Sequence, residues 1–156
     1  MANLFSLEGK NALITGASYG IGFNIAKAFV EAGIKNIIFN DINEAALERG
    51  LANYAEAGIT NVKGYVCDVT DEVAVKALVE KIHKDVGQID ILVNNAGIIK
   101  RIPMHEMVRK DFQAVIDVDL VAPYIVSSAV LPEMMERREG KIINICSMMS
   151  ELGRET

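Results

Sequence analysis

An alternation of five short apolar runs with four longer helical stretches constrains the fold of this chain more than any other feature. We expect strands over residues 10–15, 36–40, 62–67, 89–93 and 141–146, and helices over about 20–32, 43–57, 70–86 and 109–138. Thr70 is expected to cap the third helix, and Pro123 and Pro132 to bend or break the fourth. The runs lack apolar–polar alternation, which is typical of strands buried on both faces. The pattern predicts an α/β fold, a doubly wound parallel sheet with helices on both faces.

A glycine-rich segment, Thr15 to Gly22 (TGASYGIG), joins the first expected strand to the first expected helix. Glycines there permit a tight turn and a close approach of backbone N–H groups to a pyrophosphate, and the helix amino terminus adds a favourable dipole. A plain strand-to-helix turn with incidental glycines is the alternative. The flanking strand and helix favour a dinucleotide site, since the mechanism needs both.

Asp41 lies directly after the second expected strand, 25 residues after Gly16. An acidic residue near this position binds the adenosine ribose hydroxyls in dinucleotide folds, and its charge repels a 2′-phosphate. Neighbouring Asn40 and Ile42 supply no positive charge. The sequence therefore favours NAD as cofactor, with NADP less favoured. Asp41 could also cap the helix that follows it.

Composition argues against several other classes of protein. The chain has 156 residues, of which 51% are apolar, and its net charge is −5. This length predicts one domain over 1–156, and the charge argues against a nucleic-acid partner or a polybasic membrane patch. The longest uncharged apolar run, 120–132, is shorter than the ~20 residues of a membrane-spanning helix. With no secretory pattern at residues 1–10, no CxxC pair and two distant histidines, we expect a cytoplasmic protein without a metal site.

Four motifs in order resemble the short-chain dehydrogenase/reductase family. They are the glycine loop with its Thr-Gly-x-x-x-Gly-x-Gly spacing, Cys67-Asp68-Val69, Asn94-Asn95-Ala96-Gly97, and Ser147 after the last strand. The resemblance implies a Rossmann-like fold and an NAD(P)-dependent oxidoreductase acting on CH–OH groups. The strings at 94–103 and 143–156 are similar to gluconate 5-dehydrogenases, which interconvert gluconate and 5-ketogluconate. 2-Dehydro-3-deoxygluconate dehydrogenases are close alternatives.

The resemblance also implies roles for individual residues. The expected pyrophosphate contacts are Gly16, Ser18, Tyr19, Gly20, Ile21 and Gly22. Asp68 and Val69 would hold the adenine, while Asn95, Ala96 and Gly97 would flank the ribose nearer the nicotinamide. Ser147 would donate a hydrogen bond to the reacting oxygen of a sugar-acid substrate. Arg101 and Arg154 are candidates for its carboxylate, and Met148 for the pocket wall, although surface solubility explains either arginine as well.

Two departures from the family pattern stand out. The family places a catalytic asparagine where this chain has Asp119, which can accept hydrogen bonds but, when ionised, cannot donate them. The family's Tyr-x-x-x-Lys pair follows the serine, and no tyrosine of this chain has a lysine four residues later. We therefore expect the sheet to be incomplete on its carboxyl-terminal side and the chain to be inactive by itself.

Two other interpretations remain open at this point. One is a non-catalytic dinucleotide-binding module, and the other is a serine hydrolase built on Ser147, which lacks a G-x-S-x-G motif. The expected open edge at residues 141–146 and the resemblance predict a homo-oligomer, a tetramer in the full-length family.

Overall fold

The computed structural model describes residues 5–147. The strands are β1 (Asn11–Thr15), β2 (Asn36–Asp41), β3 (Val62–Val66), β4 (Ile91–Asn94) and β5 (Lys141–Asn144). The helices are α1 (Gly20–Glu31), α2 (Glu44–Glu56), α3 (Glu72–Asp85), α4 (Arg109–Ile116), the π-helical turn η1 (Asp117–Val121) and α5 (Ala122–Arg137). Every expected strand and helix is present, with ends that differ by one or a few residues.

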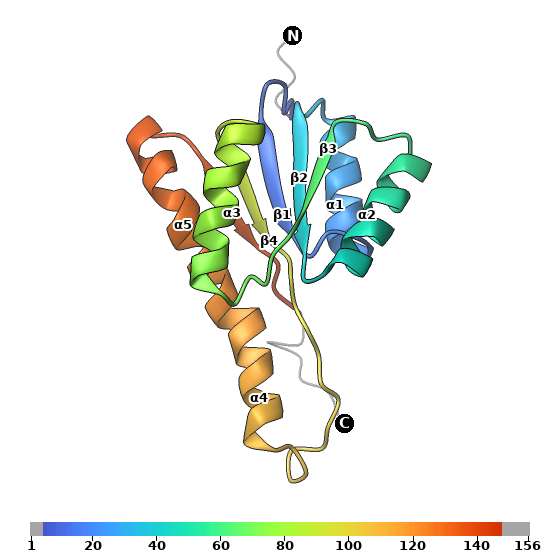
Figure 1. Cartoon of the computed structure of the whole chain (residues 1–156), viewed down its shortest axis with the longest axis vertical. Coiled ribbons are helices and arrows are strands. Elements are labelled where there is room, and N and C mark those ends of the chain that lie inside the picture. The colour runs from blue at the N-terminus through green and yellow to red at the C-terminus, as the bar shows by residue number, and fades with distance from the viewer. Residues whose placement is uncertain (1–4, 148–156) are drawn as a thin grey trace.

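The five strands form one parallel sheet in the order β3-β2-β1-β4-β5. Helices α1 and α2 cover one face, and α3 and α5 cover the other, while α4 and the segment before it extend beyond the carboxyl edge of the sheet (Figure 1). The chain order reverses between β1 and β4, so this edge carries a topological switch point, where doubly wound proteins bind their ligands. The predicted doubly wound sheet is confirmed.

The core lies in two layers because successive strand residues point to opposite faces. Leu13 of β1 and Ile38 of β2 belong to the cluster that packs under α3 and α5. Their neighbours Ile14 and Phe39 belong to the cluster that packs under α1 and α2. Both faces of the central strands are therefore fully buried, which explains the lack of alternation in their sequences.

The prediction that Thr70 caps α3 is wrong. Asp71 is the N-cap, and its Oδ1 accepts hydrogen bonds from the N–H groups of Val73 (2.9 Å) and Ala74 (3.0 Å). The Thr70 hydroxyl instead donates to Asp68 Oδ1 at 2.7 Å. The carboxylate of Asp68 holds Thr70 in the turn before the helix, so the helix begins one residue later.

The expected single helix over 109–138 is continuous from Arg109 to Arg137, but it contains one π-helical turn just before the first of its two prolines. In η1 the Ala122 N–H donates to the Asp117 carbonyl, five residues earlier. Pro123 follows directly; it has no N–H, and its ring would collide with the Asp119 carbonyl in a regular helix. The wider π turn accommodates this conflict, whereas Pro132 lies inside an unbroken α5.

The β5 strand is an edge strand, since in the part of the chain described here it pairs with β4 alone. Most of its residues are exposed, including the apolar Ile143. The continuous helical stretch Arg109–Arg137 is long and apolar enough to cross a membrane by length and composition, a test that core helices of soluble proteins also pass. Its buried side chains, such as Val126 and Val130, pack against the sheet core.

Candidate nucleotide-binding site

A cavity of about 470 Å³ opens at the carboxyl ends of β1, β2 and β4, on the switch point of the sheet. Its walls come from the glycine loop, the end of β2 with the start of α2, the segment after β3, and the segment after β4. Ten of the twelve residues predicted to bind a dinucleotide line it. These ten are Gly16, Tyr19, Gly20, Ile21, Asp41, Asp68, Val69, Asn95, Ala96 and Gly97.

The glycine loop leaves room for a ligand at its tip and is packed tightly at its base. Gly20 has a φ of +66°, and a Cβ added there would meet nothing within 4 Å. Gly16 has a φ of +61°, and an added Cβ would lie 2.9 Å from Ala96 Cα. Helix α1 begins at Gly20, and the side chain of its N-cap, Tyr19, makes no capping hydrogen bond. The first N–H groups of α1 therefore have no side-chain acceptor there, which suits an anionic group at this helix end.

Ser18 and Gly22, predicted to bind the pyrophosphate, do not line the cavity. Ser18 is fully buried behind the loop, where its carbonyl accepts a hydrogen bond from Asn53 Nδ2 at 2.8 Å. A Cβ on Gly22 would lie 2.5 Å from Asn95 Nδ2. Both residues pack against the parts of the chain behind the loop and support it from there.

Thr15 holds the two glycine-containing walls together, a role that the sequence analysis missed. Its hydroxyl oxygen accepts hydrogen bonds from the N–H groups of Asn95 and Ala96, both at 3.0 Å. Asn95 Nδ2 donates in return to the carbonyls of Thr15 (2.9 Å) and Gly16 (3.0 Å). Thr15 is the first residue of the glycine motif, and this position could have indicated its role. Its hydrogen bonds hold the segment after β4 against the loop.

The far end of the cavity is lined by charged and polar side chains from β2, α2 and the segment after β3. The Asp41 carboxylate accepts the Ile42 N–H at 2.9 Å and borders the cavity beside Asn43. Arg49 of α2, another residue that the sequence analysis missed, lines the same end and lies over the Tyr19 ring, 4.7 Å from its centroid. Cys67 forms part of the wall, and burial raises the pKa of its thiol to about 11.

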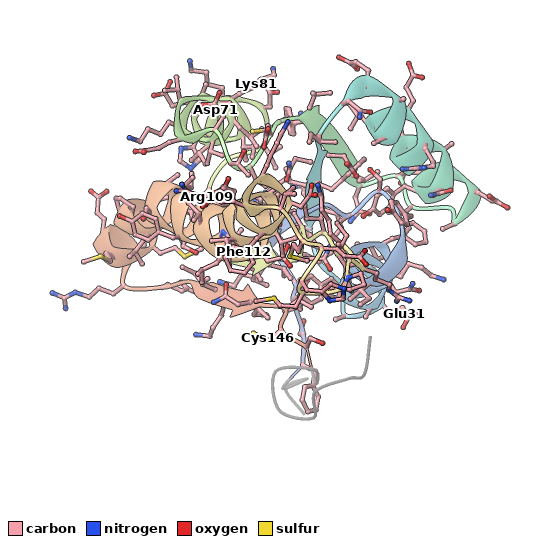
Figure 2. All side chains as sticks on the ribbon, turned by 90° about the horizontal axis from the view of Figure 1, so that it is seen from below. Glu31, Asp71, Lys81, Arg109, Phe112 and Cys146 are labelled. Atoms are coloured by element: carbon pink, nitrogen blue, oxygen red, sulfur yellow. The ribbon has the colours of Figure 1, made fainter. Side chains whose placement is uncertain are left out.

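Among the predicted catalytic and substrate residues that the structure describes, Asp119, Ser147 and Arg101 do not line this cavity. Asp119 is exposed on η1, and its Oδ1 accepts the Ile98 N–H at 2.9 Å, which ties the segment after β4 to the helix. Ser147 follows β5 and is exposed, and Arg101 lies exposed in the segment after β4. Met148 and Arg154 fall outside the described residues. Figure 2 views this edge of the sheet and shows Cys146, next to Ser147, on the side opposite α3 with its labelled Asp71 and Lys81.

No cluster of three or more His, Cys, Asp or Glu side chains that could hold a metal ion occurs within residues 5–147. The sheet, the glycine loop and the cavity at the switch point define a protein of the Rossmann-like, dinucleotide-binding class. A sequence profile described as short chain dehydrogenase matches residues 10–156. The chain therefore belongs to the short-chain dehydrogenase family.

Several members of this family are similar to the chain along nearly its whole length. The chain is 48% identical over 154 residues to the 2-dehydro-3-deoxy-D-gluconate 5-dehydrogenase of Formosa agariphila, covering 99% of this chain and 58% of that protein. It is 64% identical to a 2-keto-3-deoxy-D-gluconate dehydrogenase of Streptococcus agalactiae, with a TM-score of 0.82, covering 97% of this chain and 56% of that structure. A Burkholderia cenocepacia gluconate 5-dehydrogenase, solved with NADP and tartrate, is 41% identical with a TM-score of 0.87, covering 97% and 59%. The chain thus spans about three-fifths of its relatives' length.

Proposed function

We propose that this chain is the nucleotide-binding part of an NAD(P)-dependent oxidoreductase that interconverts a secondary alcohol and a ketone of a sugar acid. The observation that carries the proposal is the cavity of about 470 Å³ over the glycine loop, at the switch point of the sheet. The sugar-acid substrate class follows from the names of the relatives. The sequence motifs first indicated gluconate and 5-ketogluconate as the substrate pair. 2-Keto-3-deoxygluconate is the second candidate, because the relative that is 64% identical is named for that substrate.

The residues present fit a nicotinamide dinucleotide. The open space above Gly20 and the start of α1 suit a pyrophosphate, and Asp41, whose carboxylate borders the cavity, would accept a hydrogen bond from a ribose hydroxyl. When bound, such a cofactor supplies or accepts a hydride, and the protein orients it. Asn95, Ala96 and Gly97 form the wall beside the base of the glycine loop, towards which the nicotinamide ribose would extend. Ser147 would hydrogen-bond the substrate oxygen as its charge changes.

Residues 1–156 lack the tyrosine–lysine pair on which the family relies for proton transfer. Each tyrosine has a residue other than lysine four positions later. The loss of a positioned acid–base group typically costs ~10²–10⁴ in rate. We propose that residues 1–156 by themselves bind the cofactor but turn over substrate at most weakly.

A spectrophotometric assay tests the proposal. The native protein is mixed with NADH or NADPH and with 5-keto-D-gluconate, and in the reverse direction with NAD⁺ or NADP⁺ and gluconate or 2-keto-3-deoxygluconate. We expect absorbance at 340 nm to change with at least one sugar acid, and more slowly by ~10² or more with residues 1–156 alone. A native protein that oxidises or reduces none of these sugar acids would refute the substrate class.

A matched glycine pair ties the activity to the cavity. Gly16→Ala and Gly33→Ala both place a side chain at a positive φ, +61° and +83°. Only the Gly16 variant drives its Cβ against Ala96, because the space around Gly33 is open. We expect Gly16→Ala to raise the cofactor KM at least tenfold more than Gly33→Ala does. Equal effects of the two variants would show that the glycine loop is not the cofactor site.

A further inference from the structure

Two carboxylates of the helical stretch α4–η1 hold the segment of residues 95–108, which joins β4 to α4 and contains no strand or helix. Asp119 Oδ1 accepts the Ile98 N–H at 2.9 Å. Lys100 Nζ donates a hydrogen bond to Asp111 Oδ1, and the two charged side chains form an ion pair in which they are 35% and 26% exposed. Because this ion pair is partly shielded from water, it attracts more strongly than a fully exposed pair would.

The two contacts fit a segment and a helix that run in opposite directions. Residues 98–100 lead away from the sheet, whereas α4 and η1 lead back towards it (Figure 1). Asp119 therefore meets Ile98 close to the sheet. Asp111 comes eight residues earlier, ~12 Å further along the helix axis, and meets Lys100. A regular α-helix would turn Asp119 ~80° away from the direction of Asp111, and the wider turn at η1 reduces this rotation, so both carboxylates face the segment.

Arg101 follows Lys100 directly but is not held against the helix. Lys100 is half-buried, whereas Arg101 and Ile99 are exposed, and within residues 5–147 Arg101 forms no ion pair. Three residues span at most ~11 Å of chain, so the Arg101 backbone lies near Ile98, which lines the cavity beside Gly97. The nicotinamide ribose would extend towards that wall. Arg101 therefore belongs to the end of the cavity where a substrate would meet the cofactor.

We propose that Asp111 and Lys100 are positioning residues, whose ion pair holds the segment against α4 so that Arg101 can bind the carboxylate of the sugar acid. This inference rests on the proposed function. A guanidinium binds a carboxylate through two parallel hydrogen bonds only when it is held in the right place. Arg101 lies outside any helix or strand, so its position depends on contacts of its neighbours. Without the ion pair, fewer molecules would hold Arg101 in place, and the apparent affinity for the sugar acid would fall by that fraction.

Steady-state kinetics of the native protein test the inference, with saturating NADH or NADPH and with 5-keto-D-gluconate or, in reverse, 2-keto-3-deoxygluconate, whichever is converted faster. We expect Arg101→Gln to raise the KM of the sugar acid ~10- to 100-fold, the loss of charge-assisted hydrogen bonds. Asp111→Asn and Lys100→Met should each raise it ~3- to 10-fold, with kcat and the cofactor KM changed less than about twofold. Asp111→Glu keeps the charge and should stay within about twofold of the unsubstituted protein.

The double variant Asp111→Asn with Arg101→Gln separates positioning from a general structural effect. If Asp111 acts through Arg101, the double variant has the same KM as Arg101→Gln alone, because no arginine is left to position. Multiplied effects would overturn the inference, as would an unchanged KM in any of the three single variants. Lys100→Met leaves the first turn of α4 intact, so Lys100→Met with Arg101→Gln gives the same test if Asp111→Asn fails to fold.

Asp117→Asn is the matched control. It removes the same charge from the same helical stretch, but the Asp117 carboxylate accepts a hydrogen bond from Gln113 of that helix, at 2.8 Å. It should change the KM of the sugar acid less than about twofold. A control variant that raises this KM as much as Asp111→Asn does would overturn the inference. An active protein with an unchanged KM in Asp111→Asn would refute the inference alone, and a native protein that converts neither sugar acid would refute the proposed function as well.

Discussion

The strongest structural prediction concerns Asp90, whose carboxylate is buried between β1, β4 and α5. It is 3% exposed and accepts hydrogen bonds from the Asn11 N–H (2.9 Å), Gln88 Nε2 (3.1 Å) and Arg137 Nη1 (3.1 Å). Arg137 also donates to the Ile89 carbonyl at 2.9 Å. The carboxylate thus joins the start of the central strands to the last turn of α5.

Asp90→Asn keeps the shape of the side chain but removes its charge and one of its two accepting oxygens. In either orientation the new NH₂ group faces a donor, either the Asn11 N–H or the pair from Gln88 and Arg137. A buried donor left without an acceptor costs ~1–3 kcal/mol, and the lost charge-assisted hydrogen bond to Arg137 contributes a similar amount. Since the two contributions overlap, we expect the free energy of unfolding to fall by ~2–4 kcal/mol.

Urea unfolding followed by circular dichroism measures this loss. Asp71→Asn is the matched control, because Asn caps a helix as well as Asp does, and it should change stability by less than ~0.5 kcal/mol. The double variant Asp90→Asn with Arg137→Met should show a coupling of more than ~1 kcal/mol. If Asp90→Asn destabilises the protein no more than Asp71→Asn does, the reasoning from this network is wrong.

Three further predictions concern the hydrogen bond of Tyr54, the charge of Asp85 and the backbone at Arg138. Tyr54→Phe removes the donor to the Ala17 carbonyl and should cost ~1 kcal/mol in urea unfolding, against no change for the exposed Tyr124→Phe. Hydrogen bonds from Lys81 and Tyr65 hold the pKa of Asp85 below its ordinary 3.8. The stabilisation by the ionised Asp85 carboxylate is therefore present at neutral pH and is lost as the pH falls below about 4. Between pH 7 and pH 3 the Asp85→Asn variant should lose less free energy of unfolding than the unsubstituted protein, and equal losses would contradict this. Arg138 ends α5 at a φ of +54°, so Arg138→Gly should raise the thermal midpoint, with a gain of ~1 kcal/mol, and a lower midpoint would contradict the assignment of strain there.

The strands of the sheet could be predicted from the sequence because each strand is marked by a short run of apolar residues. The β-branched runs that became β1 and β2 are buried on both faces and need no information about their neighbours. The ends were harder to place. Ile89 and Asp90 resemble the start of a strand, yet β4 begins at Ile91, and the Ile89 carbonyl accepts a hydrogen bond from the Arg137 side chain. The π-helical turn η1 likewise depends on how the helix adapts before Pro123, which the spacing of apolar residues alone does not reveal.

The sequence correctly indicated those cavity-lining residues whose position is set by the main chain of a motif. Gly16, Gly20 and the segment 95–97 reach the cavity through main-chain geometry that glycine and the switch point determine. Arg49 could not be predicted in this way. Its access to the cavity depends on which face of α2 meets the glycine loop. The hydrogen bonds of Asn53 and Tyr54 to carbonyls of the loop determine that face, and they join residues more than 30 positions apart in the sequence. Ser18, inside the motif itself, is turned inward by the same packing.

Asp119 and Asp41 show that the part an acidic residue plays depends on the groups that the fold places around it. Asp119 stands where the family has an asparagine, yet the contact seen here uses only its accepting oxygen, at 2.9 Å from the Ile98 N–H. An asparagine accepts the same hydrogen bond, so the substitution preserves the attachment of the segment after β4. Asp41, in contrast, matches the rule for NAD, but its charge is one of several at that end of the cavity. Asp41 shares the lining of the cavity with Asp68 and Arg49, and Arg49 reaches the cavity only through the tertiary fold.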